Sequence, residues 1–322
     1  MEDAPLFTDI ADAPDGGKAW WLTTADGVRI RIGVWAKGSK GTVLLFPGRT
    51  EYIEKYGRAA RDLADRGYAM VAIDWRGQGL ADRLIKDPAP GHVTDFAEYQ
   101  HDVDAALQAV DQLDLPGPRF LIGHSMGGCI GLRALHRGLD VRASVFTAPM
   151  WGIQMSNVQR PAAWVFSWLS RFIGMGHRLT PGSVADSYVS VAPFEDNMLT
   201  TDADMYAYMQ RQLAAHPELA LGGPSLRWLF AALSEIRKLH ALPPPKQPGL
   251  TFLGSQERIV VSDAVERYMH CWPNGTLRKV QGAEHEVLME TPAIRKMIFN
   301  EADALFSEHD AASRPAEKQP AE

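Results

Sequence analysis

Short apolar runs alternate along much of the chain with longer segments that have helical periodicity. A run that is apolar on both faces is typical of a strand inside a parallel sheet, because helices cover such a sheet on both sides. We predict strands of this kind at 42–46, 69–73, 119–122, 144–147 and 250–253, and a less apolar strand at 276–280.

Helices are predicted between these strands, where apolar residues recur every three or four positions. An earlier pair of strands, 20–24 and 28–36, is joined by Ala25-Asp26-Gly27 and is predicted to form a hairpin. Strands that alternate with helices indicate an α/β fold with a mostly parallel central sheet and helices on both faces. The predicted helices are 52–66, 97–113, 125–137, 263–272 and 291–306.

The alternation stops between 149 and 240, a helical stretch rich in Trp and Met that contains no convincing buried strand. We predict that this stretch is a cap inserted over the carboxyl edge of the sheet. The polar end of the chain has the composition of a disordered segment. The expected organisation is an amino-terminal extension (1–18), a core (19–148 and 241–307), the helical cap (149–240) and a disordered tail (308–322).

Composition and charge argue against several classes of binding partner and cofactor. The chain has 322 residues and a net charge of -6, so it lacks the basic footprint of a nucleic-acid-binding protein. Its two cysteines, Cys129 and Cys271, are expected to be free thiols. The sequence shows no secretory signal and no apolar run long enough to span a membrane, so we expect a cytoplasmic protein. The carboxylates of Glu284, Glu286 and Glu290 have no His or Cys at metal-ligand spacing, so neither a metal nor a cofactor is expected.

The most informative stretch is Gly123-His124-Ser125-Met126-Gly127, which follows a predicted strand and precedes a predicted helix. Strand, tight turn and helix around G-x-S-x-G form a nucleophile elbow, whose strained turn exposes the serine hydroxyl at the carboxyl end of the sheet. Bulky residues at the two glycine positions would collide with the neighbouring strand and helix. Ser125 is therefore the candidate nucleophile.

A serine hydroxyl needs a general base, because it is a poor nucleophile at neutral pH. With this elbow the chain order is Ser, then Asp or Glu, then His. His285 follows the last predicted strand and precedes the last helix, at the same sheet edge as Ser125, and is the candidate base. His124 adjoins Ser125, but neighbours in a tight turn point in different directions, so we expect it to pack near the elbow.

The base in turn needs a carboxylate that orients it. Glu257 lies in the loop after the strand 250–253 and is the candidate acid. Asp263 is the alternative, although its position suits the N-cap of the next helix. Glu286 adjoins His285 and would need an awkward backbone to turn back onto it.

An oxyanion hole requires two backbone N–H groups aimed at the developing negative charge. Met126, the residue after the nucleophile, is expected to supply one of them. The loop after the strand 42–46 is expected to supply the other from Arg49, with Thr50 as the alternative. The Arg49 side chain is either structural or a partner for an anionic group of the substrate.

Five motifs in this order resemble the α/β-hydrolase superfamily, specifically its monoglyceride lipase and bacterial lysophospholipase branch, also labelled serine aminopeptidase-like. The resemblance covers about residues 20–305. Two positions depart from the family pattern: Pro47 replaces a histidine, and Glu257 replaces an aspartate. The motifs are the oxyanion loop at 46–56, Asp-x-Arg-Gly-x-Gly at 74–79, the elbow at 123–128, Asn-x-Leu-Thr-x-Asp at 197–202 and Gly-Ala-x-His-Glu at 282–286.

The resemblance implies an α/β-hydrolase fold and a serine hydrolase that cleaves lipid-like carboxylic esters, such as a lysophospholipid or a monoacylglycerol, through an acyl-enzyme on Ser125. Met150, Trp151 and Trp164 of the cap are candidate substrate contacts, and the cap's aromatic residues suggest transient contact with a membrane surface. Two alternatives remain open: a small-ester carboxylesterase or peptidase, and a non-catalytic binding protein with a hydrolase fold. No pattern in the sequence indicates an oligomeric state.

Overall fold

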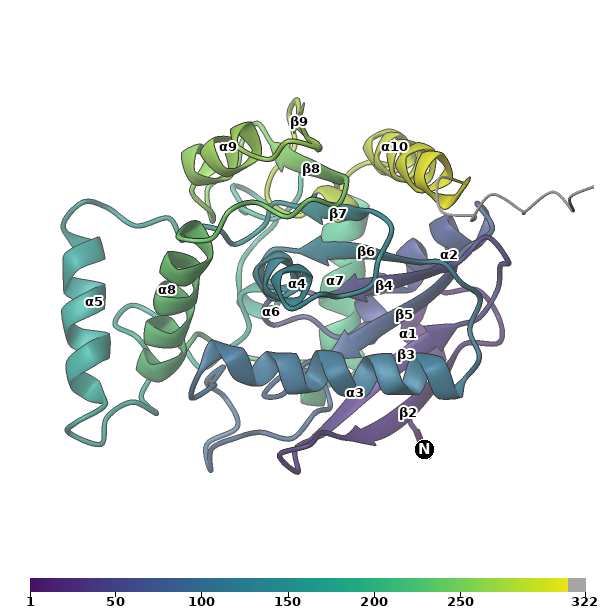
Figure 1. Cartoon of the computed structure of the whole chain (residues 1–322). Coiled ribbons are helices and arrows are strands. Elements are labelled where there is room, and N and C mark those ends of the chain that lie inside the picture. Colours follow the sequence, from purple (N-terminus) through teal and green to yellow (C-terminus); the bar gives the residue numbers. More distant parts are fainter. Residues whose placement is uncertain (312–322) are drawn as a thin grey trace, which may run out of the picture.

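A single sheet of nine strands forms the centre of the computed structural model, which describes residues 1–311 (Figure 1). The strand order is β1-β2-β3-β5-β4-β6-β7-β8-β9. The strands are β1 (Glu2–Ala4), β2 (Lys18–Thr23), β3 (Arg29–Trp35), β4 (Thr42–Phe46), β5 (Ala69–Asp74), β6 (Arg119–His124), β7 (Ser144–Thr147), β8 (Gly249–Gly254) and β9 (Gly275–Val280).

Strand direction divides the sheet into two parts. The pairs β1/β2, β2/β3 and β3/β5 are antiparallel, whereas every pair from β5 through β4, β6, β7 and β8 to β9 is parallel. The carboxyl ends of the parallel strands therefore meet along one edge, where open α/β sheets bind ligands. The predicted hairpin, the six predicted parallel strands and the α/β-hydrolase fold class are confirmed.

Helices cover both faces of the sheet, and α3 and α4 lie in front of it in Figure 1. The α-helices are α1 (Thr8–Ala11), α2 (Gly57–Ala64), α3 (Tyr99–Gln112), α4 (Met126–His136), α5 (Gln159–Ser170), α6 (Tyr188–Val191), α7 (Ala203–Ala215), α8 (Leu226–His240), α9 (Ser262–His270) and α10 (Pro292–Ala311). Short 3-10 helices are η1 (Ile53–Tyr56), η2 (Phe96–Glu98), η3 (Pro217–Leu219) and η4 (Val287–Met289).

Strand β4 shows how the core is divided between the two faces. Because side chains alternate along a strand, Leu44 and Phe46 enter the cluster that includes side chains of α3, α4 and α9. Val43 and Leu45 enter the opposite cluster, which includes side chains of α2 and α10. All four are buried, as a run that is apolar on both faces requires.

The first eighteen residues are part of the fold, which differs from the extension expected from the sequence. Strand β1 pairs antiparallel with β2, placing Glu2 opposite Trp21. Helix α1 is tied to the rest of the chain through Ala11, whose carbonyl accepts a 2.7 Å hydrogen bond from the Tyr208 hydroxyl. A three-residue strand and a one-turn helix are too short to produce a recognisable hydrophobic period.

Residues 149–240 are inserted in the chain between β7 and β8 and contain helices α5 to α8. Figure 1 shows α5 standing beside α8 at the left, away from the sheet. Helix α8 joins this segment to the core, because the buried side chains of Trp228 and Ala232 belong to the same cluster as α3 and α4. We keep the name cap for residues 149–240.

The end of the chain differs in part from the expected tail. Helix α10 runs to Ala311, so residues 308–311 are helical rather than disordered. The remainder of the predicted tail, 312–322, lies outside the described residues. Within residues 1–311, no helix combines the length and apolar character needed to cross a membrane.

Candidate active site

Ser125 occupies a strained turn between the end of β6 and the start of α4. Its backbone has φ 49° and ψ -114°, outside the regions that side-chain-bearing residues normally adopt. Its N–H donates to the carbonyl of Thr147 at 3.0 Å, which ties the turn to the end of β7. A Cβ on Gly127 would collide with the carbonyl oxygen of Phe46, so only glycine fits there.

The structure brings Ser125, His285 and Glu257 into one hydrogen-bonded chain. His285 Nε2 lies 2.9 Å from Ser125 Oγ, and His285 Nδ1 lies 2.8 Å from Glu257 Oε2. An ionised carboxylate only accepts hydrogen bonds, so Nδ1 carries the imidazole proton. Nε2 is then left unprotonated, as required to accept the proton of Ser125.

Glu257 is held ionised by its surroundings. Burial acts to raise the pKa of its carboxyl group, but the facing imidazole of His285 and hydrogen bonds to the carboxylate outweigh burial and lower it. Its second oxygen, Oε1, accepts hydrogen bonds from the N–H groups of Ile259 at 2.6 Å and Val260 at 2.9 Å. The carboxylate is therefore fixed by its own loop while it faces His285.

The alternatives to this arrangement lie elsewhere. Asp263 is exposed in the first turn of α9, whose N-cap is Val261, so the predicted N-cap role for Asp263 was wrong. The ring of His124 is held by the end of β7, with Nδ1 3.0 Å from Thr147 Oγ1. Burial lowers the pKa of His124 to about 4, so its imidazole is neutral at pH 7.

The two expected oxyanion donors, the N–H groups of Met126 and Arg49, have no hydrogen-bond acceptor among the described residues. Their neighbours in the loop after β4 are occupied: Gly48 N–H donates to Glu51 Oε2, and Thr50 N–H donates to the side chain of Gln78 at 3.3 Å. Of the two residues considered from the sequence, Arg49 rather than Thr50 has a free N–H group.

Gln78 fixes this loop, and the sequence analysis gave it no role. Its Nε2 donates to the carbonyls of Gly48 at 2.8 Å and Glu51 at 3.0 Å, and its Oε1 accepts from Thr50. Gln78 lies in the motif at 74–79, at one of its two variable positions. A variable position gives no signal of function, so the motif did not indicate this role for Gln78.

A buried ionic cluster lies beneath the oxyanion loop. Lys55 Nζ is 2.7 Å from Glu51 Oε1 and 2.6 Å from Glu286 Oε2. Burial acts to raise the pKa of Glu51, but the Lys55 ammonium and nearby hydrogen bonds lower it to about 2. Glu51, His124 and Glu286 present possible metal ligands within 4.8 Å of one another. The Lys55 ammonium binds both carboxylates and so already supplies the cation between them.

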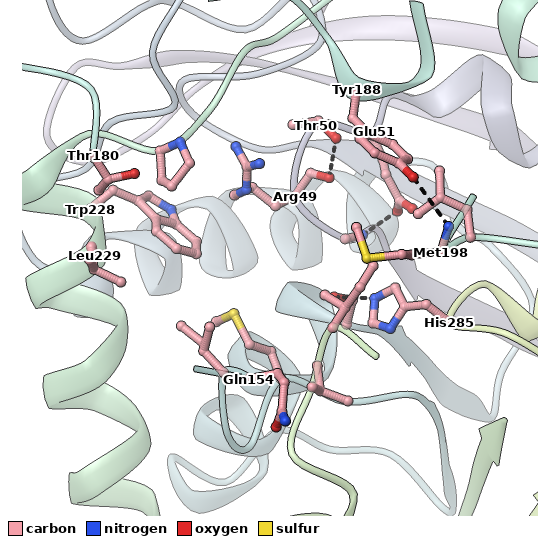
Figure 2. Close-up of a pocket in the computed structure, with 18 of the residues that line it drawn as sticks. Arg49, Thr50, Glu51, Gln154, Thr180, Tyr188, Met198, Trp228, Leu229 and His285 are labelled. Atoms are coloured by element: carbon pink, nitrogen blue, oxygen red, sulfur yellow. Dashed lines mark hydrogen bonds between the residues drawn. The ribbon is translucent and has the colours of Figure 1, made fainter. Parts of the chain in front are cut away.

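A cavity of about 700 Å³ opens over Ser125 and His285, between the sheet edge and the cap (Figure 2). Met150 lines it, as expected. Trp151 and Trp164 do not, so their predicted substrate contacts were wrong. Trp151 is buried in the core, where its Nε1 donates to Gly128 O at 3.2 Å. Trp164 instead stacks edge-on against Phe230, on the side of α5 that faces α8.

The cap supplies much of the cavity's apolar wall, and most of the residues that form this wall were not assigned from the sequence. The large apolar side chains of this wall come from the loops of the cap and from helices α5, α7 and α8. These side chains are Ile153, Met155, Phe166, Met198, Leu199, Met209, Leu213, Trp228 and Leu229.

Comparison with known proteins identifies the family of the chain. The model of the family described as "Serine aminopeptidase, S33" matches residues 37–292. Lysophospholipase L2 of Escherichia coli K12 is 30% identical over 306 residues, covering 91% of this chain and 88% of that protein. Human monoglyceride lipase is 26% identical over 309 residues and 92% of each chain.

A solved structure gives the same picture of the fold. A soluble variant of monoglyceride lipase from Saccharomyces cerevisiae, in complex with a substrate analog, superposes with a TM-score of 0.69. It shares 22% sequence identity, covering 89% of this chain and 94% of that one. The family match over most of the chain and the shared fold confirm the resemblance carried by the motifs. The chain belongs to the serine aminopeptidase S33 family of α/β-hydrolases.

Proposed function

We propose that this protein is a serine hydrolase that cleaves the carboxylic ester of a single-chain lipid, a lysophospholipid or a monoacylglycerol. One observation carries the proposal: the hydrogen-bonded chain of Ser125, His285 and Glu257 faces a largely apolar cavity beneath the cap. An apolar cavity of this size suits an acyl chain better than a polar peptide. The relatives named for lysophospholipid and monoglyceride hydrolysis support the same substrate class.

The geometry assigns a role to each group in acyl transfer. His285 Nε2 takes the proton of Ser125 as Oγ attacks the ester carbonyl carbon. The negative charge that develops on the carbonyl oxygen is held by the N–H groups of Met126 and Arg49. The protonated imidazole then gives its proton to the leaving alcohol, while Glu257 stabilises the imidazolium. Water attacks the acyl-enzyme by the same sequence and releases the fatty acid.

The test of this function combines a covalent probe with a substrate series. A fluorophosphonate should label the wild-type protein at Ser125 and leave Ser125→Ala unlabelled. Nitrophenyl esters of increasing chain length should be hydrolysed best at medium or long chains. Activity that peaks at acetyl and is lost by octanoyl would instead indicate a small-ester carboxylesterase, and a folded protein with no Ser125 adduct would indicate a non-catalytic binding protein.

We further propose that the cap contacts the membrane in which such lipids reside. Among residues 1–311, every exposed large apolar side chain except Met1 lies between 158 and 191, on α5, on α6 and in the segments next to them. Phe166 belongs to this surface and also lines the cavity. A lipid that leaves the membrane at this surface therefore has a continuous apolar path to Ser125.

A further inference from the structure

Arg49 carries a positive charge in the cavity that no carboxylate balances. Its side chain is half-buried and lines the cavity, and no carboxylate of residues 1–311 lies within ion-pairing distance of it. Its one hydrogen bond to a described residue runs from Nη1 to the carbonyl of Gly222 in the cap, at 2.8 Å. A charge removed from water without a counter-ion is costly, so its retention needs an explanation.

Two other arginines show how this fold balances an internal cation. Arg31 is fully buried and pairs with both Glu54 and Asp74. Arg76 is likewise buried and pairs with Asp102 and Asp26. Each of these guanidinium groups is paired with at least two carboxylates. Arg49 carries the same guanidinium group but has no carboxylate partner among residues 1–311.

The remaining donors of Arg49 are available to a ligand. A guanidinium carries five N–H donors in a planar fork, and neither Nε nor Nη2 of Arg49 donates to a residue of the described chain. Figure 2 shows the side chain extending towards Trp228 and away from His285, and the guanidinium carbon lies 5.7 Å from the Trp228 ring centre. Burial lowers the pKa of Arg49 to about 10, so the group is still charged at pH 7.

Lys55, the other permanent cation lining the cavity, does not compete for the same role. Its ammonium is bound between Glu51 and Glu286. An anion that enters the cavity therefore meets one unpaired positive group, and that group belongs to the residue whose backbone N–H faces the reacting carbonyl. The distance between these two groups is the reach of one arginine side chain, which suits the glycerol unit that separates ester from phosphate in a lysophospholipid.

We propose that the Arg49 guanidinium binds the phosphate of a lysophospholipid whose ester carbonyl lies at the N–H group of the same residue. This inference rests on the proposed lipid-esterase function and selects between its two substrates. The planar fork can hold two phosphate oxygens at once. A monoacylglycerol places only a neutral hydroxyl there, which leaves the cation unpaired. Arg49 is therefore a specificity-determining residue that favours lysophospholipid.

The test compares two substrates with the same acyl chain, a lysophosphatidylcholine and a 1-monoacylglycerol, below their aggregation concentrations. The measured quantity is the ratio of their kcat/KM values. Arg49→Met keeps the backbone N–H and removes the charge, and should lower this ratio about ten- to a hundredfold, the size expected for a lost charge-assisted hydrogen bond. Arg49→Lys keeps a charge without the fork and should fall between wild type and Arg49→Met.

The ratio separates a recognition role from a structural one. If Arg49 serves only to hold the cap through Gly222, its replacement damages the site for both substrates alike, and an unchanged ratio overturns the inference. Arg211→Met is the matched control, because Arg211 is an exposed cap arginine on α7 outside the cavity. Its ratio should equal that of wild type. A wild-type protein that hydrolyses neither lipid overturns the proposed function itself.

A measurement on the wild-type protein covers the case in which Arg49 variants do not fold. Two ether lipids without an ester carbonyl, 1-O-octylglycerol and 1-O-octylglycero-3-phosphocholine, are used as inhibitors of nitrophenyl butyrate hydrolysis. The inhibitory concentration of the phosphate-bearing lipid should be at least about tenfold lower than that of the lipid without phosphate, because only the phosphate can pair with the Arg49 guanidinium. Equal inhibition by the two lipids would contradict phosphate recognition in this cavity.

Discussion

Glu257 occupies the position at which the family pattern has an aspartate, a shorter acid. A glutamate adds one methylene, so its carboxylate reaches further from the backbone. In this structure the extra reach is used locally: Oε1 accepts hydrogen bonds from Ile259 and Val260, while Oε2 meets His285. We infer that the loop turns back on itself to bring the longer side chain to the correct distance.

Replacing Glu257 by glutamine should lower kcat/KM by about 10²- to 10⁴-fold, because the imidazolium loses its counter-charge and the tautomer of His285 is no longer fixed. The comparison is made with a soluble nitrophenyl ester at pH 8. Asp263→Asn is the matched control and should stay within about twofold of wild type, since Asp263 is exposed. A loss confined to Asp263→Asn would reverse the assignment of the acid.

Residues of the candidate site could be predicted from the sequence where the neighbouring residues in the chain determine their position in the fold. Ser125 follows a strand and precedes a helix, and His285 follows the last strand. The cap residues that line the cavity were harder to predict from the sequence. A tryptophan in a helical stretch suits a cavity wall and a core equally well, and only tertiary packing places Trp151 in the core and Trp164 against Phe230.

At the scale of elements, the cap motif at 197–202 acts as a support for the histidine loop. Glu286 N–H donates to the carbonyl of Leu199 at 2.7 Å, and Thr200 Oγ1 donates to the carbonyl of Met289 at 2.7 Å. Glu290 is fully buried and accepts hydrogen bonds from Thr201 Oγ1 at 2.6 Å and from Glu284 N–H at 2.9 Å. The loop that presents His285 is thus held by the cap.

Glu290→Gln should destabilise the fold by about 2–3 kcal/mol, because the charge-assisted hydrogen bonds are lost and the amide NH₂ would face the Thr201 N–H group in either orientation. Urea denaturation of the purified protein measures the change. Glu266→Gln is the control, since Glu266 pairs with Lys279 at the exposed surface and such pairs contribute about 1 kcal/mol or less. Equal stability of the two variants would show that Glu290 is not a structural anchor.

The predicted elements were accurate where a periodic signal extends over several residues. Strand β4 was predicted with its observed bounds, and α4 to within one residue. Strand β1 was missed because it has only three residues, two of them exposed acidic residues, which resemble any polar terminus. The contacts between 197–202 and the histidine loop join residues far apart in the chain, so no local pattern encodes them.

At the scale of the whole molecule, polar and apolar surfaces are segregated. The exposed large apolar side chains gather on the cap between 158 and 191, while the chain as a whole has a net charge of -6. A net charge away from zero favours solubility. The cap therefore presents the one part of the described surface that suits an uncharged lipid bilayer.

The double variant Trp168→Ser/Phe172→Ser should reduce hydrolysis of lipid presented in phosphatidylcholine vesicles by roughly tenfold, because the proposed membrane-contact surface loses two exposed apolar side chains. Neither residue lines the cavity, so hydrolysis of soluble nitrophenyl butyrate should remain at the wild-type rate. Vesicle co-sedimentation and turnover are measured on the same preparations. Unchanged vesicle turnover would remove the cap surface from the membrane proposal.

The insertion of the cap between β7 and β8 also bears on when the protein becomes active during its synthesis. Ser125 and the oxyanion loop belong to the part of the chain made before the cap, whereas Glu257 and His285 belong to the part made after it. Domains acquire structure from the amino terminus as synthesis proceeds. A nascent chain therefore carries Ser125 without Glu257 and His285 until β8 and β9 join the sheet, and by the proposed mechanism it hydrolyses lipid only after that step.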